Sequence, residues 1–274
     1  MSGSVAGHYD RVTAAWTLLL GDELHYGLFR DAQNLQLATR SLTEAMTKAA
    51  RIGPGDHVLD VGCGVGAPAC YLAREIGARV TGISTSREGL RLAAQRASRE
   101  GVGERISFER RDGMDNGFPD ASFDRVLVLE SSHLMRRRDR LISECSRVLV
   151  PGGRIALCDI VLRRRLPFSE VRRLRRSLAL LREVFGDARM EPVSEYRRLY
   201  EENGLAVDLE LDLTAATRQT FRCWIENAET HAAEVADLVG AAAHQRFVEA
   251  CTVMEDFWDD GTLGYALLAA SKAQ

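Results

Sequence analysis

One stretch of the sequence decides the fold: Val58-Leu59-Asp60-Val61-Gly62-Cys63-Gly64-Val65-Gly66. It begins as an apolar strand, carries a carboxylate near the end of that strand, and continues into three glycines spaced two residues apart. Residues 70–73 then continue as a helix. A side chain at any of these glycines would hold a ligand away from the backbone. The spacing therefore predicts a loop in which a ligand lies on bare amides at the N-terminus of a helix.

The glycines alone fit two ligands, a dinucleotide and S-adenosylmethionine. Residues 62–67 also match the relaxed dinucleotide pattern, which needs an acidic residue about twenty positions further on for the ribose. There the predicted strand at 78–83 is followed by Ser84, not by an acidic residue. Asp60, two residues before the first glycine, would repel a pyrophosphate and attract the ammonium group of a methionine moiety. These residues favour S-adenosylmethionine.

The rest of the chain alternates strands and helices. Strands are predicted at 78–83, 106–110, 125–129 and 154–159, and helices at 86–99 and 139–149. Thr85 and Glu88 are spaced for a capping box at the start of the first of these helices. The alternation indicates an α/β fold with a doubly wound, mostly parallel sheet. Residues 205–210 and 265–270 are expected to close one edge of it.

Three later segments carry a family resemblance. Residues 117–124, 130–135 and 147–154 read GFPDASFD, ESSHLM and RVLVPGGR. In this order after the glycine loop, they resemble the class I S-adenosylmethionine-dependent methyltransferases. More narrowly, they are similar to the small-molecule, natural-product branch that includes the sugar O-methyltransferases of rebeccamycin-type pathways. The resemblance implies a Rossmann-like seven-stranded sheet with an antiparallel strand at the closing edge, and it disfavours a nicotinamide oxidoreductase.

Length and composition limit the other classes. A chain of 274 residues suits a single domain with additions, and its formal net charge of −3 argues against a general nucleic-acid binder. No apolar run is long enough to cross a bilayer, and no signal peptide is recognisable at the N-terminus. The six cysteines are scattered without a CxxC pair, which is typical of reduced core residues. We expect a cytoplasmic enzyme with a small-molecule acceptor, no nucleic-acid or membrane partner and no metal; a homo-oligomer stays open.

We expect one methyltransferase domain over residues 1–274. Its predicted parts are an N-terminal helical cap at 1–50, a cofactor-binding core at 51–162, a helical lid inserted after the fifth strand at 163–204, and closing strands and helices at 205–274. Segments outside such a core usually cover the carboxyl edge of the sheet, where ligands bind.

The resemblance assigns cofactor roles to several residues. Gly62, Gly64 and Gly66 are expected to approach the methionine portion, and Asp60 to help hold its amino group. Ser84, sharing the role with Thr85, is expected at the ribose hydroxyls, where the broader family usually carries an acidic residue.

The adenine and the sulfonium have their own candidates. Asp112 matches the family position that accepts a hydrogen bond from the adenine amino group, although it also reads as a turn residue before Gly113. Met114 is expected to pack against the adenine. Tyr26 resembles a cap residue that folds over the cofactor, where its ring can stabilise a sulfonium.

Catalysis is assigned to residues beyond the fourth and fifth strands. His133 is the preferred general base, because an imidazole with an ordinary pKa near 6.5 suits proton acceptance near neutrality. Asp159 ends the neighbouring strand and is expected to orient His133. Glu130 lies beside the expected methyl-transfer point or caps the following segment. The related sugar methyltransferases often carry a second histidine where this chain has Leu134. A purely pocket-shaping His133, with catalysis by positioning alone, therefore stays open.

The acceptor is not fixed by the sequence. Arginines cluster at 136–140 and again at 163–176, either to bind an anionic acceptor or as a solvated helix face, which we favour. O-methylation of a hydroxyl on a specialised metabolite is the main hypothesis. C- or N-methylation, including an alkene or prenyl diphosphate acceptor, and a methyltransferase fold acting as a cyclase remain alternatives.

Overall fold

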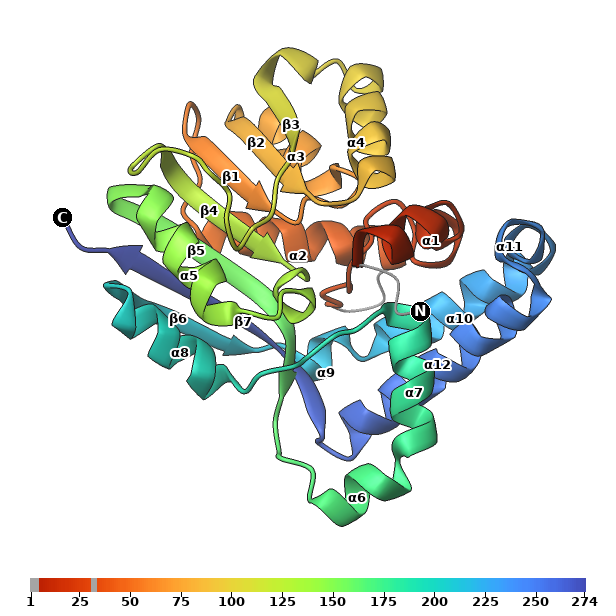
Figure 1. The fold of residues 1–274 in the computed structure, drawn as a ribbon. Helices are drawn as coiled ribbons and strands as arrows, with labels where there is room; N and C mark the ends of the chain where they lie inside the picture. The colour runs from red at the N-terminus through yellow and green to blue at the C-terminus, as the bar shows by residue number, and fades with distance from the viewer. Residues whose placement is uncertain (1–4, 31–33) are drawn as a thin grey trace.

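A seven-stranded sheet forms the centre of the computed structural model, which describes residues 5–30 and 34–274 (Figure 1). Its strand order is β3-β2-β1-β4-β5-β7-β6. The first five strands run parallel, and β7 is antiparallel to both of its neighbours. The bounds are β1 (His57–Val61), β2 (Arg79–Ser84), β3 (Ile106–Arg110), β4 (Phe123–Leu129), β5 (Leu149–Leu162), β6 (Leu205–Asp212) and β7 (Leu263–Lys272). The predicted doubly wound α/β fold is confirmed.

Helices surround this sheet. They are α1 (Val5–Leu19), α2 (Leu35–Ala49), α3 (Ala67–Tyr71), α4 (Arg87–Arg99), α5 (Arg138–Val148), α6 (Phe168–Arg173), α7 (Arg175–Phe185), α8 (Val193–Glu202), α9 (Thr214–Thr217), α10 (Gln219–Thr230), α11 (Ala232–Val239) and α12 (Ala241–Asp259). A π-helical turn, η1 (Leu72–Ile76), continues α3, and short 3₁₀ turns lie at η2 (Gly103–Arg105) and η3 (Ser132–Leu134). Within the described part of the chain, no helix combines the length and apolarity needed to span a bilayer.

The central strands are buried on both faces, as in other parallel sheets covered by helices. On one face, α5 and α8 pack with β5 and β6, and Tyr196 and Tyr200 of α8 are fully buried there (Figure 1). The lid predicted at 163–204 is therefore wrong at its end: α8 belongs to the packed core, because its tyrosines fill the space between the sheet and α5.

The N-terminus of α4 is capped differently from the prediction. Ser86, not Thr85, is the N-cap residue, and its Oγ accepts a hydrogen bond from Gly89 N at 3.0 Å. The hydroxyl donates in turn to Asp10 Oδ1 of α1 at 2.6 Å, and Glu88 N donates to the same oxygen at 3.1 Å. The predicted capping box is wrong, because the Asp10 carboxylate of α1 accepts the hydrogen bonds at the N-terminus of α4. This contact docks α1 against the core.

A second helical group lies beyond the carboxyl ends of the parallel strands. It consists of α1, α7, α10, α11 and α12, which pack on one another (Figure 1). Their apolar residues join those of α2 and the sheet in the larger core cluster. Segments from the two ends of the chain thus cover the edge of the sheet near which Asp60 and Asp159 lie.

The buried side chain of Arg154 ties α2 to the closing edge. Arg154 of β5 donates from both terminal nitrogens to Asp208 of β6 at 2.6 Å, and its Nε donates to Ala49 O at 2.6 Å. Arg154→Met should lower the free energy of unfolding by about 1–3 kcal/mol, because it removes the charge-assisted hydrogen bonds to Asp208 and leaves the buried Ala49 carbonyl without its donor. Chemical denaturation measures the change.

Arg51 provides the matched control. It approaches the same Asp208 carboxylate at 3.5 Å, but its side chain is 69% exposed. Arg51→Met should therefore change stability by less than about 1 kcal/mol. Equal effects of the two substitutions would contradict the importance given to burial.

Candidate active site

A cavity of about 660 Å³ lies at the carboxyl ends of the strands, under the second helical group. It brings together most of the residues singled out in the sequence. Those lining it are Tyr26, Asp60, Gly62, Gly64, Ser84, Thr85, Asp112, Gly113, Met114, Glu130 and His133. Two predicted residues do not line it. Asp159 is fully buried behind His133, and Gly66 is the N-cap residue of α3 and does not line the cavity.

The three glycines of the loop serve different purposes. All have positive φ angles, +82° at Gly62, +53° at Gly64 and +76° at Gly66. A Cβ at Gly62 would lie 2.2 Å from Ser131 Cβ, and one at Gly66 would lie 2.8 Å from Ala93 Cβ. A Cβ at Gly64 would meet nothing within 4 Å and would project into open space. Protein packing therefore requires glycine at positions 62 and 66, whereas Gly64 leaves its backbone open to the cavity; the roles of all three toward a cofactor stay predictions.

Asp60 presents a carboxylate with an open hydrogen-bonding position. The residue is buried, and its Oδ2 has no hydrogen-bond partner among the described residues. Burial raises the pKa of Asp60 to about 7, and the nearby His25 works against that rise. A buried carboxylate oxygen without a donor is costly unless a ligand satisfies it. Together with the open space at Gly64, Asp60 fits the ammonium group expected in the cofactor.

The opposite end of the loop region has the residues expected near the adenosine. Ser84 Oγ accepts a hydrogen bond from Ser86 N at 3.1 Å, and Thr85 is exposed at the cavity edge. Asp112 Oδ1 accepts from Met114 N at 2.9 Å, so the turn described as its alternative role is present. Gly113 is packed tightly, since a Cβ there would lie 2.7 Å from Val61. The roles of these residues toward a cofactor stay predictions.

The structure joins His133 and Asp159 at the carboxyl ends of β4 and β5. His133 Nδ1 lies 2.6 Å from Asp159 Oδ1, and the Asp159 carboxylate also accepts from His133 N at 3.1 Å and Ile160 N at 2.8 Å. Ser132 Oγ donates to Asp159 Oδ2 at 2.5 Å and lies 2.7 Å from the hydroxyl of Tyr196. Burial opposes ionisation of Asp159, but the attraction of His133 and these donors outweighs it and lowers the pKa of Asp159.

This arrangement fixes the tautomer of His133. An ionised Asp159 accepts hydrogen bonds only, so Nδ1 carries the proton that faces it. Nε2 has no partner among the residues that the structure describes, and the imidazole lines the cavity. A neutral His133 therefore offers a lone pair at Nε2, oriented by a carboxylate that several donors prevent from rotating.

Glu130 holds the segment after α1 in place. Its Oε1 accepts hydrogen bonds from Tyr26 N at 2.7 Å and from the hydroxyl of Tyr265. Its backbone has a φ of +46°, a conformation that a non-glycine residue adopts at a cost. Burial raises the pKa of Glu130 to about 7. Glu130 is thus an anchor for Tyr26 as well as a cavity residue.

Tyr26 is more firmly held than a mobile cap would be. Its ring is buried and stacks on Trp258 with centroids 5.5 Å apart and planes 3° apart. Phe221 and Trp224 pack edge-on against the same ring. The residue still lines the cavity, so its role beside a sulfonium stays a prediction.

The arginines are mostly engaged at the surface. Arg164 pairs with Glu170 at 2.8 Å, Arg137 with Asp139 at 2.6 Å, and Arg136 and Arg182 both bind Asp187. None of the arginines from 163 to 176 lines the cavity, whereas Arg136 and Arg137 of the first cluster do, as do Arg111 and Arg182. The rest of the wall is mostly apolar, and its larger apolar residues are Trp16, Leu134, Ile160, Leu166, Leu178, Leu181, Phe185, Met190, Trp224, Met254 and Phe257. This arrangement favours the solvated-face interpretation.

Sequence reasoning missed two sets of residues. Trp224, Met254 and Phe257 of α10 and α12 line the cavity, although 205–274 was expected only to close the core. Ser132 supports Asp159, 27 residues further along the chain, and Tyr196 contacts Ser132 from 64 residues away. The sequence contains no local signal for contacts of this range. Among residues 5–30 and 34–274, no cluster of histidine, cysteine and acidic side chains could hold a metal ion.

Comparisons with known proteins agree with this geometry. A family model described as a methyltransferase domain matches residues 59–157. The chain is 35% identical to methyltransferase GfsG of Streptomyces halstedii, over 99% of this chain and 95% of that protein. It is 34% identical to 27-O-demethylrifamycin SV methyltransferase of Amycolatopsis mediterranei, over 96% and 95% of the two chains. The crystal structure of the [4+2]-cyclase SpnF superposes with a TM-score of 0.84 at 27% identity, covering 99% of this chain and 98% of that one.

The glycine loop yields a paired prediction. Gly62→Ala should lower the free energy of unfolding by about 2–4 kcal/mol, because the new methyl group collides with Ser131. Gly64→Ala should cost only about 1–2 kcal/mol for its left-handed backbone and should weaken binding of S-adenosylhomocysteine at least tenfold. Denaturation curves and titration calorimetry separate the two effects. Undiminished binding by Gly64→Ala would contradict a ligand lying on this backbone.

Proposed function

The chain belongs to the class I S-adenosylmethionine-dependent methyltransferases that act on natural products, and we propose that it methylates a hydroxyl group of a large, apolar metabolite with His133 as the base. As an enzyme of this family it transfers a methyl group from S-adenosylmethionine to a small molecule. The observation that carries the finer proposal is the Nδ1–Oδ1 contact of 2.6 Å between His133 and Asp159 at the edge of an apolar cavity.

The cofactor would be held along the glycine loop. S-adenosylmethionine supplies an electrophilic methyl group on a sulfonium. Asp60 would receive its ammonium group, and Gly64 would let the backbone approach it. Ser84 and Thr85 would bind the ribose, Asp112 and Met114 the adenine, and Tyr26 would lie near the sulfonium. Much of the rate enhancement would come from positioning in a cavity that excludes water.

His133 would accept the proton that the acceptor hydroxyl loses. Its Nε2 has no partner among the described residues, and Asp159 holds the imidazole in the tautomer that leaves this nitrogen unprotonated. As the proton arrives, the imidazolium gains a buried carboxylate partner, which stabilises the charge. Such a base contributes a factor of about a hundred to ten thousand in rate.

The acceptor proposed here is apolar and uncharged over most of its surface. Apart from Thr13 of α1 and Arg182 of α7, the side chains that α1, α7, α10 and α12 contribute to the cavity wall are aliphatic or aromatic. Four arginines line the cavity, Arg111, Arg136, Arg137 and Arg182, but each is already paired with an acidic side chain. A diphosphate would lose water there and would have to compete with these carboxylates for the arginines. The relative named for 27-O-demethylrifamycin SV supports an oxygen acceptor on a natural product.

A cyclase is the second candidate, favoured by the likeness to SpnF over nearly the whole chain. A cycloaddition moves no proton, so it gives the oriented His133–Asp159 pair no task. We therefore place methyl transfer first. We also propose the division into cap, core and lid, with α8 assigned to the core. The enzyme is proposed to be cytoplasmic and to have no nucleic-acid or membrane partner.

The base role can be tested once an acceptor is found by mass spectrometry with isotopically labelled cofactor. His133→Ala should lower kcat at least about a hundredfold and leave affinity for S-adenosylhomocysteine unchanged. In the wild type, kcat should fall as the solution becomes acidic, because a protonated imidazole cannot accept a proton. The variant should lose this acid dependence.

His57 is the control histidine for this test. It bonds Ser122 O and Thr81 Oγ1 outside the cavity, so His57→Ala should keep the wild-type pH profile. A near-wild-type kcat in His133→Ala would exclude the base assignment. It would favour catalysis by proximity, or an alkene acceptor whose proton goes to Glu130.

The acceptor class has its own test. Leu181→Asn places an amide in the apolar wall and should raise KM for the acceptor about tenfold or more while leaving cofactor affinity unchanged. Arg176→Ala, on the exposed side of the same helix, should leave KM within about twofold. The opposite ranking would support an anionic acceptor.

A further inference from the structure

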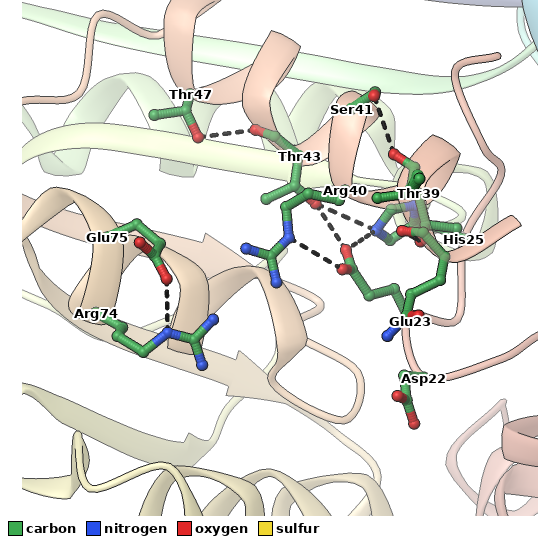
Figure 2. Close-up of polar contacts among 12 residues, drawn as sticks. Asp22, Glu23, His25, Thr39, Arg40, Ser41, Thr43, Thr47, Arg74 and Glu75 are labelled. Carbon is green, nitrogen blue, oxygen red and sulfur yellow. Dashed lines mark hydrogen bonds and ion pairs between the residues drawn. The ribbon is translucent and has the colours of Figure 1, made fainter. Parts of the chain in front are cut away.

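A buried ion pair lies beside the cavity in residues 21–28, here called the strap. His25 is 4% exposed and Glu23 is 7% exposed. His25 Nε2 lies 3.1 Å from Glu23 Oε2, and Nδ1 lies 2.9 Å from Tyr26 O. Figure 2 shows Arg40 and Thr43 of α2 reaching the same Glu23 carboxylate. The mechanism proposed above uses none of these four residues.

The contacts determine the protonation of His25. A backbone carbonyl only accepts hydrogen bonds, so Nδ1 carries a proton toward Tyr26 O. Thr43 Oγ1 donates its hydrogen to Glu23 Oε2 at 2.9 Å, so both neighbours of Nε2 are acceptors as well. Both ring nitrogens therefore carry protons, and His25 is an imidazolium. Burial opposes this charge, but Glu23 outweighs it and raises the pKa of His25.

The strap places this cation against the cavity. Tyr26 N donates to Glu130, Gly27 N donates to Thr220 Oγ1 at 3.1 Å, and Leu28 N donates to Ala38 O at 2.8 Å. His25 lines the cavity together with Asp60 and Glu130. From the surface inward, the charges thus alternate in sign: Arg40 is positive, Glu23 negative and His25 positive. The carboxylates of Asp60 and Glu130 follow.

We propose that His25 is a positioning residue for cofactor binding: its fixed positive charge favours the ionised form of the Asp60 carboxylate, which receives the cofactor ammonium. The inference rests on the proposed role of Asp60. A clamp that merely held Tyr26 O would need only a neutral donor at Nδ1, whereas the chain buries a second carboxylate, Glu23, to keep the ring charged.

The electrostatics of Asp60 explain why such help is needed. Burial raises its pKa to about 7, and His25 is the cation that opposes this rise. The other titratable group acting on this region is the thiol of Cys63, whose pKa burial raises well above its usual range, so it stays neutral. His25 itself faces Glu23 and Glu130, and Arg40 reaches only Glu23. Loss of the imidazolium should therefore favour protonated Asp60 near neutral pH.

The test is the pH dependence of S-adenosylhomocysteine binding to the full chain, measured by calorimetry from about pH 6.5 to about pH 9. His25→Gln should weaken binding about five- to tenfold at pH 7, and the ratio of variant to wild-type Kd should approach one at about pH 9. Using this ratio cancels the titration of the ligand amine. Glu23→Gln, which removes the partner of the imidazolium with little change of shape, should show the same trend.

His57→Gln is the matched control and should give a ratio of one at every pH. Thermal unfolding verifies that the variants are folded at the temperature used. A ratio that is raised equally at all pH values, or not raised at all, in both His25→Gln and Glu23→Gln would overturn the inference.

Asp60→Asn separates this inference from the proposal on which it rests. If Asp60→Asn leaves S-adenosylhomocysteine affinity unchanged, the assignment of Asp60 to the cofactor fails, and the inference fails with it. If Asp60→Asn weakens binding about tenfold or more while the His25→Gln ratio does not vary with pH, only the role of His25 fails.

Discussion

Three neighbouring strands of the sheet each have, near their carboxyl ends, a carboxylate that is removed from water. Asp60 belongs to β1, Glu130 follows β4 and Asp159 lies in β5, and these strands are adjacent in the sheet. Placing three carboxylates at one buried edge is unfavourable unless each finds a partner. Asp159 has His133 and Ser132, and Glu130 has Tyr26 N and Tyr265. Of the three, only Asp60 has a fully buried oxygen without a donor among the described residues, and this difference separates the cofactor end of the cavity from its catalytic end.

The surrounding helices make this constraint effective. α1 docks on α4 through Asp10 and Ser86, and the strap that follows it is bonded to Glu130. α7, α10 and α12 lie more than a hundred residues after the strap in the sequence, and they add apolar side chains to the wall of the cavity. Water exclusion strengthens the ion pairs inside the cavity and raises the pKa of carboxylates that lack a cation. The same cover thus shapes the acceptor space and sets the electrostatics beneath it.

The sequence predicted what depends on chain order and periodicity. Apolar runs and glycines located the strands, and adjacency of β4 and β5 was enough to expect His133 near Asp159. It could not distinguish Gly64 from Gly62 and Gly66, because that difference depends on Ser131, Ala93 and Phe108, which come from elsewhere in the fold. For the same reason it chose Thr85 over Ser86 as the cap, and left α8 in the lid. Side-chain surroundings built by long-range packing have no local pattern to reveal them.

The account centres on Asp60 as the buried counter-charge that the cofactor completes. The most direct measurement is the number of protons exchanged when S-adenosylhomocysteine binds at pH 7, obtained by calorimetry in buffers of different ionisation enthalpy. Burial raises the pKa of Asp60 to about 7, so part of the free protein carries a proton there. Binding of an ammonium group favours the carboxylate, so the account predicts net proton release, which should disappear in Asp60→Asn. Binding without proton release, or release that persists in Asp60→Asn, would contradict it.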